Sequence, residues 1–591
     1  MRQLLLLVGL SLALPIAPAA AVEPDAPDRL ITAEEGIGIR ARRLVEERAG
    51  PAEHAKKADL EALVSFYSGR NSKPLWIVDN HLSLAAKAVI AEIERGEDWG
   101  LDAKAFDLSA ADIADDAPIT DLAAAEVAVS IAVLRYANHA RGGRIPEPSK
   151  LLTTYIDRKP QLKEPSVVLA EISQAEDQAK YLRKLNPQHD GFLALRDALL
   201  KLRSPQETED GEKIVRMPST GPLLKLGVRH DDVVLLRERL NVPEPVADDE
   251  ELGEPDLRKF DRDVLAAVKA FQKDSGVYTD GVVGRKTRAA LNGGVKAEVT
   301  EQMLLANMEQ WRWMPDELGE FYVTANIPEY KVRVVREKEM VHEERIIVGK
   351  LNKQTPIFSD KMETVVFHPF WGVPNSIKVN EILPSVARGG SALRKNNLKL
   401  QYRGRNIDPN TVDWSTADIR KFHVYQPPGR GNVLGQVKFM FPNRHQVYMH
   451  DTPTKNLFNK NQRTYSHGCM RVRNPLKLAE AVLGYDKGWD ERRVQSTVKR
   501  GPDNNSIKLK KPVHVHVTYF TAVPQEDGTV KAYRDIYGHQ ERIQLALAGR
   551  WNKIRKGRDH LAPVKIDRSR IVVKQQYSDP LSDLFKQAFG F

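Results

Sequence analysis

The lone cysteine of this sequence, Cys469, lies in the segment 465–472, which reads YSHGCMRV. An isolated cysteine is about as often a small buried hydrophobe as a reactive thiol, but the neighbours here favour reactivity. Gly468 lets the backbone approach a substrate closely, and the consecutive N–H groups of Gly468 and Cys469 can face a developing oxyanion. If residues 470–472 are extended, period two places Cys469 and Arg471 on one face. A nucleophile and a cation that binds carboxylates would then point the same way.

A thiol needs a partner to become a thiolate at neutral pH, and histidine is the usual one. Two histidines are candidates: His467, two residues before the cysteine, and His450, upstream in the segment 447–453 (VYMHDTP). We expect His450 to be the base, since it lies on its own strand and can cross to the thiol. His467 would instead orient the loop or line the oxyanion site. Asp451 follows His450 directly, so its side chain should point away, and a turn role before the next proline is favoured.

Short segments with period-two alternation and β-branched residues surround this motif. They predict a β-rich domain whose strands lie near residues 322–324, 332–335, 346–348, 365–367, 436–441, 446–450 and 513–519. The interval 377–422 is polar and shows no sustained strand alternation. An irregular stretch of that length inside a domain is usually functional or disordered, so we interpret it as an inserted lid, with Gly389 and Gly390 as hinges.

The first part of the chain has helical spacing of alanine and leucine, for example over 82–94 and 122–137. It predicts a helical scaffold without a catalytic constellation. After a linker rich in Pro, Gly, Glu and Lys, residues 223–291 have the pattern of a three-helix unit. Its motif residues, among them Phe260, Gln272, Asp280, Gly281 and Thr287, resemble the small peptidoglycan-binding module of bacterial wall enzymes. An acidic insertion over 243–255 departs from that module's usual pattern and leaves open whether it binds wall or only packs.

The cysteine motif and its upstream histidine resemble the active-site signature of bacterial L,D-transpeptidases. The resemblance rests on the segments 448–453 (YMHDTP) and 466–472 (SHGCMRV). The segments 311–315 (WRWMP) and 426–429 (QPPG) resemble the large periplasmic subfamily of those enzymes. That subfamily joins a helical scaffold, a peptidoglycan-binding module and a lidded catalytic domain.

The resemblance implies Cys469 as nucleophile, His450 as base, and the Gly468 and Cys469 N–H groups as oxyanion donors. It implies Arg471 as a contact for the diaminopimelate carboxylate of the substrate, and we add Tyr448 and Ser466 as further substrate contacts. The thiolate would attack the third residue of a peptidoglycan stem, release D-alanine and pass the acyl group to an amine of a neighbouring stem. A carbapenem would acylate the same thiol. The implied chemistry needs no cofactor and no metal, and His514 and His516 are interpreted as ordinary strand residues.

The resulting fold class is multidomain α+β. The predicted parts are a signal peptide (1–21), a helical scaffold (22–203), a linker (204–222), a peptidoglycan-binding-like module (223–295), a catalytic domain (301–525, with the lid at 377–422) and a C-terminal extension (526–591). The signal peptide is indicated by Arg2, a short apolar run and small residues before the predicted cleavage after Ala21.

The chain has 591 residues, 41% hydrophobic and 28% charged, with a formal charge of +10. This is an ordinary globular composition, and one cysteine excludes intramolecular disulfides. Export to the periplasm argues against nucleic acid as a partner, and no later stretch is apolar enough to cross a membrane. The predicted partner is peptidoglycan, and the predicted process is the cross-linking that maintains cell wall and cell shape. Two alternatives stay open: a cysteine-dependent wall hydrolase or amidase, and a non-catalytic wall-binding protein.

Overall fold

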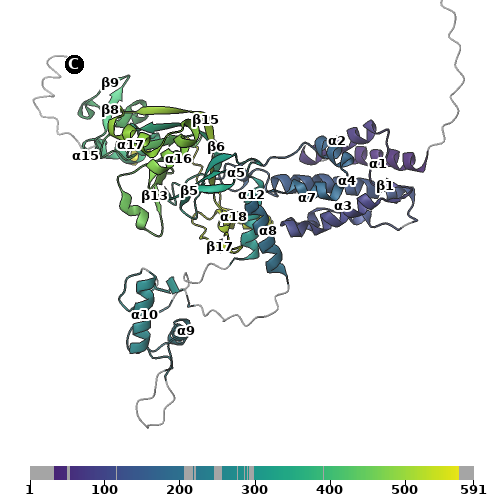
Figure 1. Ribbon diagram of the computed structural model, residues 1–591, viewed down its shortest axis with the longest axis horizontal. Helices are drawn as coiled ribbons and strands as arrows, with labels where there is room; N and C mark the ends of the chain where they lie inside the picture. The colour runs from purple at the N-terminus through teal and green to yellow at the C-terminus, as the bar shows by residue number, and fades with distance from the viewer. Residues whose placement is uncertain are drawn as a thin grey trace, which may run out of the picture. The chain divides into compact units, whose positions relative to one another are not determined.

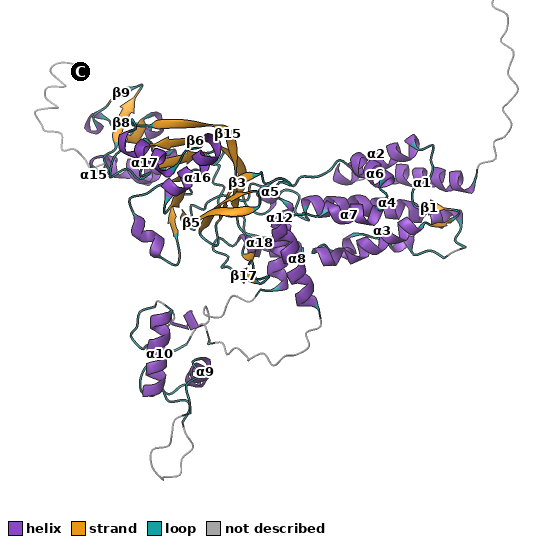
Figure 2. Cartoon of the chain, in the orientation of Figure 1, coloured by secondary structure: helices purple, strands orange, loops and turns teal. Residues whose placement is uncertain are grey.

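The computed structural model describes residues 32–49, 54–114, 116–204, 217–218, 221–244, 256–275, 277–284, 287–288, 290–291, 299–389 and 392–570. The predicted signal peptide, most of the linker and most of the acidic insertion lie outside these residues. The chain forms two compact units, which are described separately. Figure 1 traces the chain, and Figure 2 shows helices in its first part and strands gathered in the catalytic region.

The first unit is helical, as predicted. It holds α1 (Ala33–Ala49), α2 (His54–Gly69), α6 (Pro165–Gln174), most of α3 (Leu84–Glu94), the first part of α4 (Ile119–Gly142), and the short strands β1 (Ile77–Val78) and β2 (His81–Leu82). The buried Glu126 carboxylate accepts hydrogen bonds from the N–H groups of Trp76 and Ile77 and from the Tyr67 hydroxyl. The Glu126 carboxylate therefore supplies hydrogen-bond acceptors for the backbone N–H groups of the loop that carries Trp76.

The second unit begins with further helices: α5 (Pro148–Leu151), α7 (Gln178–Leu185), α8 (Asp190–Arg203) and α12 (Glu301–Arg312). The buried Glu309 of α12 accepts the N–H groups of Arg144 and Ile145 at 2.7 and 3.0 Å. Gly143 has φ +79°, and a Cβ there would lie 2.5 Å from Glu309 Oε1. The segment after α4 therefore packs closely against α12, and glycine at position 143 leaves room for the Glu309 carboxylate.

The small module at 223–291 has its own apolar core around α9 (Asp231–Arg239) and α10 (Arg262–Asp274). Phe260 and Val264 are fully buried in it. The Gln272 amide donates to Asp280 Oδ1 and Thr287 Oγ1 and accepts the Gly281 N–H. These motif residues, which carry the resemblance, thus hold the turn against α10.

The predicted catalytic domain is built on a nine-stranded sheet of order β13-β5-β14-β12-β11-β6-β15-β3-β4, and β4 also pairs with β5. Its strands are β3 (Phe321–Asn326), β4 (Lys331–Arg336), β5 (Glu339–Gly349), β6 (Phe358–Phe367), β11 (Val437–Met440), β12 (Met449–His450), β13 (Thr464–Ser466), β14 (Met470–Val472) and β15 (Asn505–Thr518). A strand is present at each predicted position, but the segment predicted at 446–450 is a strand only at Met449 and His450. The additional β4–β5 pairing closes the order into a ring of strands.

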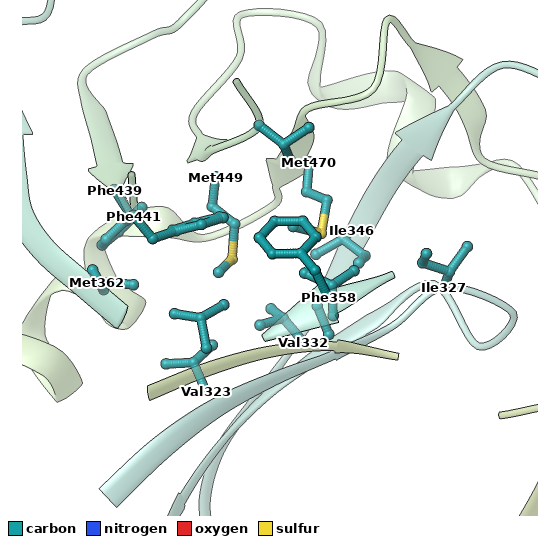
Figure 3. Packing of buried hydrophobic residues seen from close by; sticks show 14 of the residues in the cluster. Val323, Ile327, Val332, Ile346, Phe358, Met362, Phe439, Phe441, Met449 and Met470 are labelled. Atoms are coloured by element: carbon teal, nitrogen blue, oxygen red, sulfur yellow. The ribbon is translucent and has the colours of Figure 1, made fainter. Parts of the chain in front are cut away.

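Alternate residues of the central strands fill one core. Phe439 of β11, Met449 of β12 and Met470 of β14 are fully buried and lie together with Val323 and Phe358 (Figure 3). The helices α16 (Pro475–Lys487) and α17 (Glu491–Arg500) add apolar side chains to the same core. Because side chains alternate along a strand, the neighbours of these residues face away from the core.

The interval 377–422 is not irregular, and that expectation is wrong. It folds around its own core of Val379, Ile382, Leu383, Val386 and Trp414. Its elements are the π-helix η4 (Lys378–Ile382), α14 (Leu383–Ala387), α15 (Ala392–Lys395), β8 (Lys399–Tyr402) and β9 (Arg405–Asn406). The flanking α13 (Asn375–Ile377), β7 (Trp371–Gly372) and β10 (His423–Gln426) belong to the same body, because β7 and β10 complete the small sheet of order β7-β10-β8-β9. Residues 371–426 are called the inserted subdomain below. Buried apolar residues at positions 379, 382, 383 and 386 have helical spacing, which the polar residues between them obscured.

The C-terminal extension forms the hairpin β16 (Ala522–Pro524) and β17 (Val530–Ala532) and the helix α18 (His539–Leu547). Residues 560–568, called the strap below, then run to the inserted subdomain, where Val564 and Ile566 pack against its core. None of the helices in the described ranges is both long and apolar enough to cross a bilayer.

Because of His516 on β15, we expect the free energy of unfolding to depend on pH. His516 shares hydrogen bonds with Ser359 Oγ and the Leu318 carbonyl, and burial lowers its pKa to about 3. The unfolded chain binds a proton below about pH 6.5 and the folded chain does not, so the free energy of unfolding falls as pH drops from 6.5 towards 3. We expect a slope of about 1.4 kcal/mol per pH unit from this residue. Urea unfolding of His516→Gln should give a flatter pH dependence than wild type, and equal slopes would contradict the assignment.

Candidate active site

Cys469 lies at the start of β14 and lines a cavity of about 550 Å³. Tyr448, His450, His467 and Arg471 line the same cavity, so the structure gathers the predicted site residues in one place. Gly468 has φ +118°, a conformation that favours glycine. It turns the chain so that the half-buried thiol reaches the cavity.

The surroundings of the thiol are mostly electropositive. Burial raises the pKa of Cys469, while hydrogen bonds with the Tyr448 backbone and hydroxyl oppose that rise, as do the charges of Lys438 and Arg471. Sγ also lies 3.8 Å from the Gln446 carbonyl, to which it donates. Within the described residues, no hydrogen bond joins Sγ to His450. Burial therefore favours the protonated thiol, while the two neighbouring cations favour its ionised form.

His450 is 6% exposed on β12, which pairs with β11 and β14. Its Nδ1 shares a hydrogen bond with the Asp451 carbonyl, which can only accept, so Nδ1 carries the proton and Nε2 keeps its lone pair. Burial lowers its pKa to about 3, and the charges of Arg471, Lys438 and Lys455 act in the same direction. His450 is thus a neutral imidazole able to accept a proton transiently and to release it readily.

The Asp451 carboxylate bonds to groups other than the His450 ring, as its position after His450 predicts. Its carboxylate accepts hydrogen bonds from Lys455 Nζ at 2.6 Å and from the N–H groups of Thr452 and Gln436. Only its backbone carbonyl contacts His450.

The loop before the cysteine is braced internally. The Ser466 hydroxyl donates to the Cys469 carbonyl and accepts the Gly468 N–H at 3.1 Å. Thr355 Oγ1 donates to the Gly468 carbonyl at 2.8 Å. The Gly468 N–H therefore bonds to the Ser466 hydroxyl, and that hydroxyl to the Cys469 carbonyl, within the loop. Their roles as substrate contact and oxyanion donor stay predictions.

Arg471 faces the cavity beside Cys469, as the period-two argument predicts. Its Nη1 donates to Thr454 Oγ1 at 3.1 Å. Its Nε is buried and has no hydrogen-bond partner among the described residues. A guanidinium with an unused buried donor is suited to bind a carboxylate.

The inserted subdomain supplies two contacts to the site that the sequence did not reveal. Glu381 accepts hydrogen bonds from His467 Nε2 and Lys353 Nζ, each at 2.7 Å. Trp371 lines the cavity together with Tyr448, whose pKa burial raises well above its usual range. His467 is thus bonded to the inserted subdomain, and Tyr448 shares a cavity with it.

The strap forms another wall of the cavity through residues 560–564. His560 shares hydrogen bonds with His445 at 2.8 Å and Thr154 at 3.0 Å, and its ring stacks on Tyr155. Further along, Arg568 donates to the carbonyls of Ser415, Thr416 and Ala417. The strap thus joins the body of the catalytic region to the inserted subdomain.

The described ranges hold no group of three or more His, Cys, Asp or Glu side chains placed to hold a metal ion. His514 and His516 are neighbours on β15, with ring centroids 6.1 Å apart. Both ring nitrogens of His516 are hydrogen-bonded, Nδ1 with Ser359 Oγ and Nε2 with the Leu318 carbonyl. These bonds agree with the interpretation of His516 as an ordinary strand residue.

Three family models match this chain. Residues 61–199 match a scaffold domain, residues 229–291 match a domain described as "Putative peptidoglycan binding domain", and residues 320–515 match an L,D-transpeptidase catalytic domain. The three matches follow one another in the order that the sequence predicts. They also agree with the α+β architecture described above.

A curated relative from Haemophilus influenzae, named "Putative L,D-transpeptidase", is 32% identical over 257 residues, which are 43% of this chain and 51% of that protein. The match thus spans about half the length of the relative. Solved L,D-transpeptidase structures from Xylanimonas cellulosilytica and Stackebrandtia nassauensis are 15% and 13% identical. Each covers 51% of this chain, and the alignments cover 100% and 96% of those structures. TM-scores of 0.14 and 0.15 give these structures no weight in the assignment. By the sequence matches, residues 320–515 are similar to the L,D-transpeptidase catalytic domain, and they follow regions similar to a scaffold domain and a peptidoglycan-binding domain in the same chain.

Proposed function

We propose that this protein is an extracytoplasmic L,D-transpeptidase that cross-links peptidoglycan stem peptides through a thioester on Cys469. The observation that carries the proposal is the cavity in which a thiol, a neutral buried histidine and an arginine with an unpaired donor meet. Peptidoglycan is the proposed donor and acceptor, in keeping with the module matched at residues 229–291.

In the proposed reaction, Sγ of Cys469 attacks the carbonyl carbon of the third stem residue while its proton passes to Nε2 of His450. The Cys469 N–H faces the developing oxyanion, and Arg471 holds the diaminopimelate carboxylate. Collapse breaks the C–N bond, and His450 returns its proton to the leaving amine of D-alanine. An amine of a second stem then attacks the thioester, its proton passes through His450, and the thiol is restored.

The site of acylation can be tested with a carbapenem. We expect one adduct for each chain, on the tryptic peptide that contains Cys469, because the sequence has no other thiol. Intact-protein mass spectrometry with peptide mapping gives both the number and the position of adducts. An adduct on any other residue would contradict the assigned nucleophile.

The inserted subdomain is proposed to act as a lid that keeps water from the thioester, since Glu381 and Trp371 reach the site and the strap ties the subdomain to the body. Arg568→Ala removes the strap's hydrogen bonds to carbonyls 415–417. We expect this variant to acylate Cys469 but to raise the ratio of hydrolysed tripeptide to cross-linked dimer by about three- to tenfold. Both products are counted in one digest by mass spectrometry.

The matched control is Lys565→Ala, which removes an exposed cation three residues before Arg568. It should leave the product ratio at the wild-type value. An Arg568→Ala enzyme with an unchanged ratio would remove the strap and lid from the control of hydrolysis.

A further inference from the structure

One face of three neighbouring strands carries a row of basic side chains. Lys438 of β11 lies directly opposite His450 of β12, and His450 lies beside Arg471 of β14. Directly paired residues share a face of a sheet. The other face of the same strands holds Phe439, Met449 and the rest of the core (Figure 3). Lys438 therefore belongs to the face that carries the site.

Lys438 contacts Tyr448 and interacts electrostatically with Cys469. Its Nζ lies 4.2 Å from the centroid of the Tyr448 ring, a cation–π distance. Tyr448 and Cys469 line the same cavity, and the Tyr448 side chain is among the groups that lower the pKa of the thiol. Burial lowers the pKa of Lys438, and the charge of Cys469 raises it. In the described part of the chain, no carboxylate lies within ion-pair distance of Lys438, so its charge acts on Tyr448, His450 and Cys469 without a carboxylate partner.

His450 is poorly suited to be the lasting counter-charge of a thiolate. Its pKa is lowered to about 3 by burial, and the cations Arg471, Lys438 and Lys455 act in the same direction. A stable thiolate–imidazolium pair would place one more positive charge among these three. The site must therefore stabilise the sulfur's negative charge with a cation that is already present.

We propose that the Lys438 ammonium is the counter-charge of Cys469, which stabilises the negative charge that develops on Sγ while the thiol proton passes to Nε2 of His450. The proposal deepens the proposed function and rests on it. Lys438 does not line the cavity, whereas Tyr448 and Cys469 do, so it acts on the sulfur as a positioning residue without touching the substrate. Arg471 is left free to bind the substrate carboxylate.

The test is the pH profile of Cys469 alkylation by iodoacetamide, which requires no transpeptidase activity. The charged and titratable groups that face the sulfur are Tyr448, His450, Arg471 and Lys438; Lys455 faces His450. Lys438→Met keeps the length of the side chain and removes its charge. We expect its inflection to move up by about one pH unit, and alkylation at neutral pH to slow about tenfold.

Lys438→Arg keeps the charge and should restore the profile to within about threefold of wild type. Lys455→Met removes the cation paired with Asp451 and should leave the inflection in place. If Lys438→Met does not fold, Lys438→Gln supplies a second neutral variant. A folded neutral variant with the wild-type inflection would overturn the proposal.

The two proposals fail in different ways. An unchanged alkylation profile in an enzyme that still forms cross-links would reject the role of Lys438 and leave the transpeptidase function standing. A shifted profile in a protein that forms no cross-links would reject the function while the coupling of Lys438 to the thiol holds.

Discussion

Cys469→Ala is expected to lower acyl transfer by about 10⁴-fold or more, to the background without enzyme. The thiol is the sole cysteine in the chain and lies in the cavity with His450 and Arg471. Alanine keeps the Cβ atom that follows the positive φ of Gly468, so the loop braced by Ser466 and Thr355 should be preserved. The rate of dimer formation measures the loss, and the unfolding temperature reports the fold.

Cys469→Ser is the matched variant for shape. It keeps a donor at the same place but replaces the thiol by a hydroxyl that ionises far less readily. A folded Cys469→Ala enzyme that retains more than a small fraction of wild-type activity would reject the thioester mechanism.

His450→Ala is expected to lower the rate of acylation by about 10²- to 10⁴-fold, the range usual for loss of a general base. Its Nδ1 is held by the Asp451 carbonyl, which directs the free Nε2 to proton transfer. Because burial holds its pKa near 3, the residue stays neutral throughout the working pH range, and no acid limb near pH 6.5 should come from it. Single-turnover acylation measured from pH 5 to pH 9 tests both statements.

His467→Ala is the matched control, since His467 lies in the same cavity but is bonded to Glu381 of the inserted subdomain. The acylation rate of His467→Ala should fall by less than about tenfold, because His467 takes no part in the proposed proton transfer. Equal losses for the two variants would contradict the assignment of His450 as base.

Local sequence patterns predict much of this catalytic region. Alternation in short β-branched segments predicts the strands, and the segments around His450 and Cys469 predict which side chains share a cavity. These features depend on residues close together in the chain. The inserted subdomain was missed as a folded body, although Val379, Ile382 and Leu383 have helical spacing, because the polar residues between them masked the period.

Contacts between distant segments were not predictable in the same way. Glu381 is 86 residues from His467, and His560 is 115 residues from His445. Alternation between the buried Val437 and Phe439 places Lys438 on the opposite face, which is a usable signal. It does not reveal Tyr448 as its neighbour, because the register of β11 with β12 is set by the turn that joins them.

The most direct test of the account is mass spectrometry of the products that the wild-type protein makes from a purified disaccharide-tetrapeptide. The account predicts released D-alanine and a dimer in which the third residue of one stem is joined to the diaminopimelate amine of another, both absent with Cys469→Ala. Tripeptide without any dimer, at high substrate concentration and with an intact Cys469, would contradict the transpeptidase account and identify a hydrolase instead.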